Sequence, residues 1–263
     1  MKRWIYEPDL FRLFHTKKII VSILGVILAV IAGNILEMKE QADFLTVDTI
    51  MDSFLDGGWY RNFIFVLGAV PFAVSYFEDK SHGFHRQMIL RMGLEKYTSS
   101  KVKYTALSAF FVSFVGLWGA AGILSLFFKP CYYELYHEVN YSLPYGNVAA
   151  EGKTMLFLFY RITLFSLGTA FWAVFALLLS VFKMEKMVIP TLPFIGSFCE
   201  SRLRFFLPAW LLADACISGE NLLPFGILPN FLYGCCYLLL WICIFGVAFY
   251  FLVKRSIYGR KNN

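Results

Sequence analysis

The sequence predicts an all-α, polytopic membrane protein, and its composition and apolar patterning support this prediction. Hydrophobic residues make up 59% of the 263 residues and charged residues only 16%, whereas about a quarter of a soluble domain is charged. Aromatic residues reach 19%, led by 29 Phe. Apolar residues gather in runs near the length of about 20 that a helix needs to cross a bilayer. This composition excludes a large soluble catalytic domain, and six Cys in such a chain exclude a disulfide scaffold.

The whole chain, residues 1–263, is predicted to form a single transmembrane domain. An amphipathic helix at about residues 4–16 is expected to lie in the membrane interface before the first span, because apolar and charged side chains alternate there. Six spans are expected to follow. They are residues 19–36, 59–77, 104–128, 155–182, 187–206 and 231–253.

The fifth span is the least regular of the six. It reaches crossing length only if it includes Glu200, Arg202 and Arg204, whose long side chains would extend to the interface. Residues 207–228 follow; they are apolar but are interrupted by Pro208 and Pro224. This pattern predicts a re-entrant hairpin before the sixth span, with its backbone covered by protein.

Lys and Arg decide the predicted orientation, because cytoplasmic segments of membrane proteins are enriched in them. With the N-terminus inside, 17 of the 24 basic residues fall in inner segments, which then carry +11 while the outer segments carry −5. Both termini are therefore predicted to be cytoplasmic. Nucleic-acid binding is not expected, because the basic residues are spread over four short segments.

The inner loop, residues 77–103, is the most informative segment. Gly83 and Gly93 bracket residues 84–92 and predict a separate helix of about two and a half turns. A short rigid helix set across the ends of two spans suits the docking of a cytoplasmic partner. An ordinary interfacial loop is the alternative interpretation.

Side-chain spacing predicts which face of this short helix is apolar. Phe84, Met88 and Met92 recur every four residues and share one stripe. Arg86 and Gln87 lie off that stripe. The stripe is therefore the expected contact face.

Small residues recur every four positions in the first span, at Gly25, Ala29 and Gly33. Such a stripe permits close approach of two helices. It fits either a seam between two copies of the chain or an internal contact.

Arg161 is the one basic residue inside an otherwise apolar span, and intramembrane charge suggests a functional site. One interpretation is an anchor that reaches the outer interface, and the other is an ion pair or a cavity. The same alternatives apply to Asp214 in the predicted hairpin. Glu200 and Arg204 complete the candidates for a pathway or an interface.

Sequence motifs for catalysis are missing. The chain has no G-x-x-x-x-G-K-[ST], H-E-x-x-H or G-x-S-x-G, so neither an ATPase nor a catalytic residue is predicted. His82 and His85 have a spacing compatible with a metal, but no Cys or further His lies near them. We expect them to be surface residues of the loop and predict no metal site.

Together these features resemble the ABC-2 type transporter permeases, which are membrane subunits of bacterial type V ABC exporters. The architecture is similar over nearly the whole chain, and most like permeases that pair with a separate ATPase and export antimicrobial peptides such as lantibiotics, or give immunity to them. The chain departs from the family pattern at Glu200-Ser-Arg-Leu-Arg204. The local motif is Phe77-Glu78-Asp79, Gly83, Arg86, Arg91-Met-Gly, Tyr97 and Lys101.

The resemblance implies a permease that exports a peptide, an antibiotic or a lipid-like substrate. Residues 84–92 would be a coupling helix seated in a groove of the ATPase, with Glu78 and Asp79 holding its base. The implied coupling residues are Glu78, Asp79, Gly83, Phe84, Arg86, Gln87, Met88, Arg91 and Met92.

The resemblance also implies the partners and the location. Two ATPase subunits would bind ATP and Mg, while this chain would bind no cofactor itself. A second permease, identical or paralogous, would complete the pathway with the first and fifth spans toward the shared axis. The complex would lie among the lipids of the bacterial plasma membrane.

A different function remains open on the sequence alone. The first outer loop, residues 37–60, holds six acidic residues against one Lys, which permits a non-transporting immunity or scaffold protein that binds a peptide outside. A solvated loop is the simpler interpretation of the same residues. A membrane-embedded enzyme or a proton-driven carrier is disfavoured, because no paired acidic or His residues are evident at mid-membrane depth.

Overall fold

The computed structural model describes residues 17–35, 46–56, 59–129, 145–182, 185–220, 222 and 226–258. In this part of the chain every named element is a helix, and the only β pairing is an isolated bridge between Thr46 and Lys129. The all-α prediction is confirmed. The predicted interfacial helix at residues 4–16 lies outside the described residues. The helices are α2 (Lys17–Gly33), α4 (Val47–Asp56), α5 (Trp59–Ala69), α6 (Ser75–Ser81), α7 (Phe84–Met92), α8 (Leu94–Leu124), α10 (Gly146–Ala150), α11 (Thr154–Leu179), α12 (Leu192–Leu203), α13 (Ala213–Ile217) and α14 (Ile227–Tyr258), with 3₁₀ turns η2 (Ile189–Thr191) and η3 (Ala209–Leu211).

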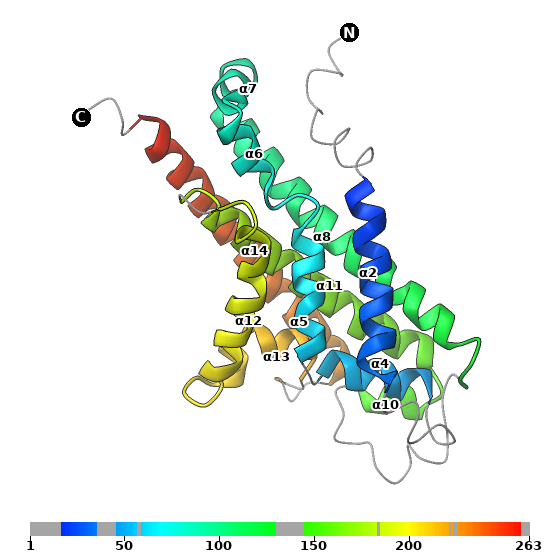
Figure 1. Ribbon diagram of the computed structural model, residues 1–263. Helices are drawn as coiled ribbons and strands as arrows, with labels where there is room; N and C mark the ends of the chain where they lie inside the picture. Colours follow the sequence, from blue (N-terminus) through cyan, green and yellow to red (C-terminus); the bar gives the residue numbers. More distant parts are fainter. Residues whose placement is uncertain are drawn as a thin grey trace.

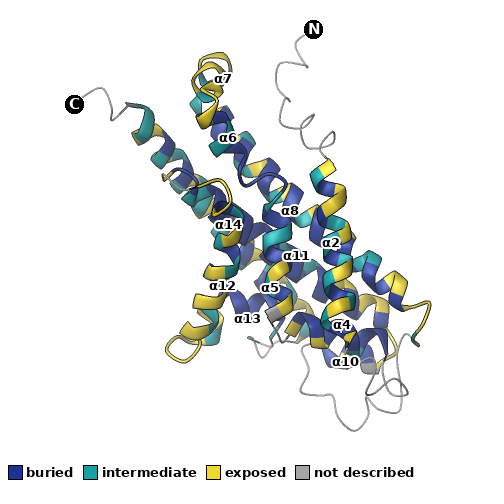
Figure 2. Ribbon diagram, viewed as in Figure 1, coloured by how far each residue is buried: buried dark blue, intermediate teal, exposed yellow. Residues whose placement is uncertain are grey.

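Three of the described helices, α8, α11 and α14, are long and apolar enough to cross a membrane. Helix α11 lies at the centre and packs against α8, α14, α5 and α12. Figure 2 shows α11 largely buried, whereas α14 exposes much of its surface. Up to Val253, the exposed side chains of α14 are apolar, among them Leu240, Val247 and Phe251. A long helix with an exposed apolar face is what a lipid-facing span requires.

The segment predicted as the second span, residues 59–77, is not one continuous helix. Helix α5 ends at Ala69, a turn follows, and α6 begins at Ser75. Pro71 accounts for the break, because it has no amide hydrogen to donate to the helical ladder. Figure 1 shows α6 carrying the chain on toward α7 after this break.

Four other predicted spans have different ends. The helix within the first covers Lys17–Gly33 and the helix within the fourth Thr154–Leu179, shifted by two or three residues at most ends. The third and the sixth are longer than predicted. Helix α8 already begins at Leu94, and α14 extends over Ile227–Tyr258. Charged residues ended these two spans in the prediction, but charge alone does not end a helix.

The fifth span and the hairpin are shorter than predicted. Helix α12 covers only Leu192–Leu203, which is about 18 Å at 1.5 Å per residue and too short to cross a bilayer alone. In place of a long hairpin, η3 and the five-residue α13 follow. All five residues of α13 are buried. Its contacts with α11 and α14 cover its backbone.

The molecule has two polar ends. In Figure 1 the helices α6 and α7 and the C-terminal end of α14 lie at one end, and α4 and α10 lie at the other. We refer to these as the α7 end and the α4 end. Both hold ion pairs between residues that are distant in sequence.

Candidate functional site

The short helix predicted from the inner loop is present with the predicted bounds. Helix α7 spans Phe84–Met92, and Gly83 and Gly93 flank it with φ angles of 73° and 83°. Positive φ is accessible to glycine because it lacks a Cβ. The two glycines thus separate α7 from α6 and α8 and let the chain reverse direction around it.

The exposed face of α7 differs from the stripe predicted on it. No residue of α7 is buried, yet Met88, Ile89 and Met92 pack partly against the core. Phe84 is 52% exposed and Leu90 is 87% exposed. Of the predicted stripe, Met88 and Met92 therefore lie toward the core and Phe84 faces outward, and apolar residues occur on both sides of this helix. The outward residues are Phe84, Arg86, Gln87, Leu90 and Arg91.

A buried ion pair holds the base of α7. Asp79 of α6 lies 2.7 Å from the Lys101 ammonium group of α8, and both residues are almost fully buried. The Tyr97 hydroxyl donates a hydrogen bond of 3.1 Å to the same carboxylate oxygen. Lys101 also lies near the rings of Phe72 and Tyr97, at 5.4 and 5.5 Å. These contacts fix α6 to α8 just below α7.

Glu78, its neighbour, connects α6 to two other elements. Its carboxylate lies 2.7 Å from Lys186 and 3.5 Å from Lys18. Burial raises the pKa of Glu78, but the hydrogen bond to Lys186 and the charges of both lysines outweigh it and lower the pKa. Lys80 donates to the carbonyl of Val181 at 2.9 Å. Helix α6 is thus fixed to α2, α8 and the chain that follows α11.

No functional role was predicted for His82 and His85 at the α7 end. His82 is exposed, and its ring lies 6.2 Å from that of Phe84. Burial and the nearby cations Arg86 and Lys80 lower the pKa of His85. Its imidazole is therefore neutral near pH 7.

At the α4 end, Arg161 is buried and does not reach the interface. It is 1% exposed and lies 2.7 Å from the Asp52 carboxylate of α4. It also donates to the carbonyl oxygen of Ser218 and lies 3.9 Å from Asp56. Burial raises the pKa of Asp52, and the positive charge of Arg161 opposes that rise. Of the two alternatives for Arg161, the structure supports the ion pair.

A second buried pair at this end joins Arg61 of α5 to Asp214 of α13. Arg61 also donates to the Leu55 carbonyl at 3.1 Å and to the Ser218 hydroxyl at 3.0 Å. Arg61 was not among the predicted site residues, although a basic residue at the start of an apolar run was a usable signal. Its partner lies 153 residues away in the chain.

The remaining candidates of this end also serve contacts within the chain. Glu200 accepts a hydrogen bond from the Ala213 amide, and Arg204 pairs with Glu220. Asp48 and Asp52 are buried, so these two acidic residues do not form part of an open patch for a cationic peptide. The solvated-loop interpretation does not apply to them either.

The small residues of the first span make internal contacts. A Cβ added at Gly25 would meet Leu67 of α5 at 3.1 Å, and one at Gly33 would meet Phe54 of α4 at 2.9 Å. Ala29 lies between them on α2 and is half-buried. Of the two alternatives for this stripe, the structure supports an internal contact.

Comparison of the chain with family models, with curated proteins and with solved structures finds no match. The arguments that follow therefore rest on the sequence and on the geometry described above.

Proposed function

We propose that the chain is the membrane subunit of an ATP-driven ABC exporter and that a separate ATPase docks on α7. The observation that supports this proposal most strongly is the geometry of α7. An amphipathic helix of nine residues, free on its outer face, is bracketed by two glycines and fixed at its base by a buried ion pair. A solvated loop would need neither the flanking glycines nor the buried ion pair.

Six crossings fit the order of the helices. The chain runs from the α7 end to the α4 end in α2, returns through α5 and α6, and then passes back and forth through α8 and α11 and through α12 and α14 (Figure 1). The short or broken helices α12 and α5 would cross in company with the long ones, where protein satisfies their backbone. The excess of Lys and Arg supports a cytoplasmic α7 end.

The proposed mechanism is mechanical and not catalytic. ATP-driven closure of two ATPase subunits would push on α7. The pair of Asp79 and Lys101 would carry that movement into α8, which is 31 residues long and reaches the α4 end. There the pair of Arg161 and Asp52 joins α11 to α4. Movement between two such packed arrangements would alternate access to the pathway.

The exposed face of α7 defines the chemistry of the partner. Leu90 and Phe84 are exposed apolar side chains of this face, and Arg86, Gln87 and Arg91 are exposed beside them. The matching surface is an apolar groove with acidic residues at its rim, because buried apolar anchors supply affinity and rim charges supply orientation.

The test is co-purification from native membranes in a mild detergent. We expect a stoichiometric soluble protein with a P-loop to accompany the wild type and to be lost from Leu90→Asp. Met187→Asp is the matched control, because Met187 is similarly exposed, at 81%, and lies off α7. Recovery of the chain alone, under conditions that preserve other membrane complexes, would contradict the proposal.

A further inference from the structure

A groove between α8 and α14 is not used by the proposed mechanism. One cavity, of about 590 Å³, lies between the two helices and is lined by Gly246 and Val247 of α14 among others. A second, of about 460 Å³, shares Glu95 and Tyr250 with the first and is also lined by Met92, the last residue of α7. The shared lining makes the two cavities one continuous groove, which reaches the end of α7.

The two helices of the groove end their apolar runs at different levels. A Cβ added at Gly246 would meet the Val102 side chain at 3.2 Å, so the next residue, Lys103, lies level with this part of α14. No charged residue follows Lys103 before α8 ends. On α14 the first charge is Lys254, eight residues after Gly246, which is about 12 Å at 1.5 Å per residue. The apolar run of α14 therefore extends about 12 Å further toward the α7 end than that of α8.

Helix α2 supports the level that α8 marks. Both helices run from the α7 end to the α4 end (Figure 1), and a Cβ added at Gly116 of α8 would meet Val26 of α2. The apolar run of α2 begins after Lys18, eight residues before Val26, and thus no nearer to the α7 end than Lys103. Acyl chains surround the apolar run of a span and headgroups its flanking lysines. The part of α14 beyond Gly246 therefore lies past the acyl chains.

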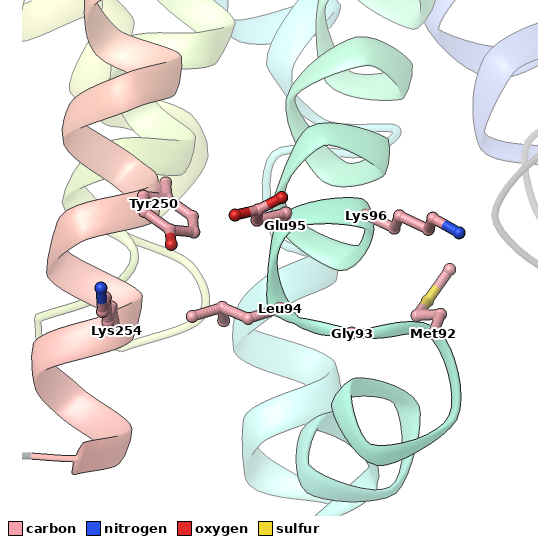
Figure 3. A pocket seen from close by; sticks show the side chains of 7 residues that line it. All are labelled: Met92, Gly93, Leu94, Glu95, Lys96, Tyr250 and Lys254. Atoms are coloured by element: carbon pink, nitrogen blue, oxygen red, sulfur yellow. The ribbon is translucent and has the colours of Figure 1, made fainter.

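The two sides of the groove differ in chemistry at this level. On α14, Val247 and Phe251 are 56% and 59% exposed. On α8, the lining residues include Glu95, Ser99 and Lys103, and Figure 3 shows Glu95 facing α14 across the gap. An acyl chain does not suit a groove with one charged side. An amphipathic helix does, because its apolar face can cover α14 while its polar face meets α8.

The charge of the groove favours an acidic partner. The charged lining residues of the two cavities are Glu95, Lys96, Lys103 and Lys254, so three lysines stand against one glutamate. In the described part of the chain neither Lys103 nor Lys254 forms an ion pair with a carboxylate. A second copy in the same orientation would bring its own inner segments, which carry +11, and would be repelled. Opposite charge at the rim attracts and orients a partner.

We propose that this groove takes an acidic amphipathic helix of a soluble cytoplasmic protein. Its apolar side would lie on Val247 and Phe251, and its carboxylates would face Lys103 and Lys254. Since the groove reaches the end of α7, a partner seated on α7 is placed to supply this helix. The inference rests on the proposed function for the cytoplasmic side of the groove, but it holds for a soluble partner with or without a P-loop.

Photo-crosslinking in native cells tests the site, with p-benzoylphenylalanine in place of Phe251 in the full chain. We expect a crosslink to a soluble protein. Mass spectrometry should map it to a helix with apolar residues on one side and Asp or Glu on the other. Lys103→Glu/Lys254→Glu should lower the yield about tenfold, because attraction becomes repulsion at two exposed positions.

Two controls accompany this measurement. Lys153→Glu/Arg202→Glu makes the same change of charge at exposed residues that do not line the groove, and we expect an unchanged yield. The same probe at Leu240, which is 57% exposed and lies further from the α7 end, should crosslink lipid only.

Three outcomes would overturn the proposal. Lipid as the only product at position 251 would show an ordinary lipid-facing surface, and a crosslink to a second copy would show that a dimer covers the groove. An unchanged yield after charge reversal would exclude an acidic partner.

The groove and the exporter can fail separately. A crosslinked acidic helix from a protein without a P-loop would support the groove and contradict the exporter. A P-loop protein that is lost from Leu90→Asp but does not crosslink at position 251 would overturn the groove alone.

Discussion

The buried pair of Asp79 and Lys101 gives the most direct test of how α7 is held. In Lys101→Met the carboxylate of Asp79 stays buried, keeps the hydrogen bond from Tyr97 and loses the ammonium group that lay 2.7 Å from it. Removing one partner of a buried ion pair costs about 3–5 kcal/mol, because the other charge loses both water and its counter-ion. We therefore expect the free energy of unfolding to fall by about that amount.

The double variant Asp79→Asn/Lys101→Met separates the pair from the fold. It removes both charges, and the Asn side chain still accepts a hydrogen bond from Tyr97. We expect it to lose less than about 1.5 kcal/mol, the scale of one net hydrogen bond. The double-mutant cycle should then give a coupling energy of at least about 2 kcal/mol, within the range for residues in contact.

The assay is unfolding by SDS in mixed micelles, followed by tryptophan fluorescence. Lys103→Met serves as the control, since Lys103 is exposed on the same helix, and we expect a change within about 0.5 kcal/mol. A double variant that loses as much as the two single variants together would refute the reasoning. In that case the contact would contribute nothing to holding α6 against α8.

Three further predictions concern the ion pairs of Arg161 and Glu78 and the glycine at position 93. Arg161→Met should lower the free energy of unfolding by about 3–5 kcal/mol, and adding Asp52→Asn should restore most of it; no restoration would contradict the pair. The pKa of Glu78 is lowered from 4.5, so its stabilisation is present above pH 4.5 and is lost as the pH falls through the lowered value; the difference in stability from Glu78→Gln should disappear in acid, and a difference that grows there would be contrary. Gly93→Ala should cost about 1–3 kcal/mol through its positive φ alone, since its Cβ would meet nothing within 4 Å. Gly122→Ala, also without neighbours but without a positive φ, should cost nothing, and equal effects of the two would refute the backbone argument.

Local sequence predicted α7 well because its limits depend on local conformation. Gly83 and Gly93 adopt positive φ, which other residues disfavour wherever the chain folds. Which side of α7 faces inward is not a local property, because it depends on the core beneath, formed by Tyr76, Phe249 and Val253 from other helices. Spacing alone does not distinguish Met88, which packs inward, from Leu90, which faces out.

For the charged residues too, local sequence gives the position, whereas the partner depends on how the helices pack. The predicted third span begins only at Tyr104, after Lys101 and Lys103, because a lysine is costly in a membrane. The carboxylate partner of Lys101 comes from another helix, so α8 continues through this position. The pairing of Arg161 with Asp52 likewise joins two helices that no local pattern connects. A one-dimensional pattern locates a charge but does not identify its counter-ion.

The two pairs at the α4 end differ in the order in which the ribosome makes their members. Asp52 precedes Arg161, so the arginine of α11 emerges when its counter-ion already exists. Arg61 precedes Asp214 by 153 residues, which is about 8 to 30 s of synthesis at 5–20 residues per second. During that interval a cation destined for the interior has no counter-ion from α13. Translation therefore completes the packing of α5 only when α13 has been made, and a chain interrupted before α13 leaves the Arg61 guanidinium without the Asp214 carboxylate.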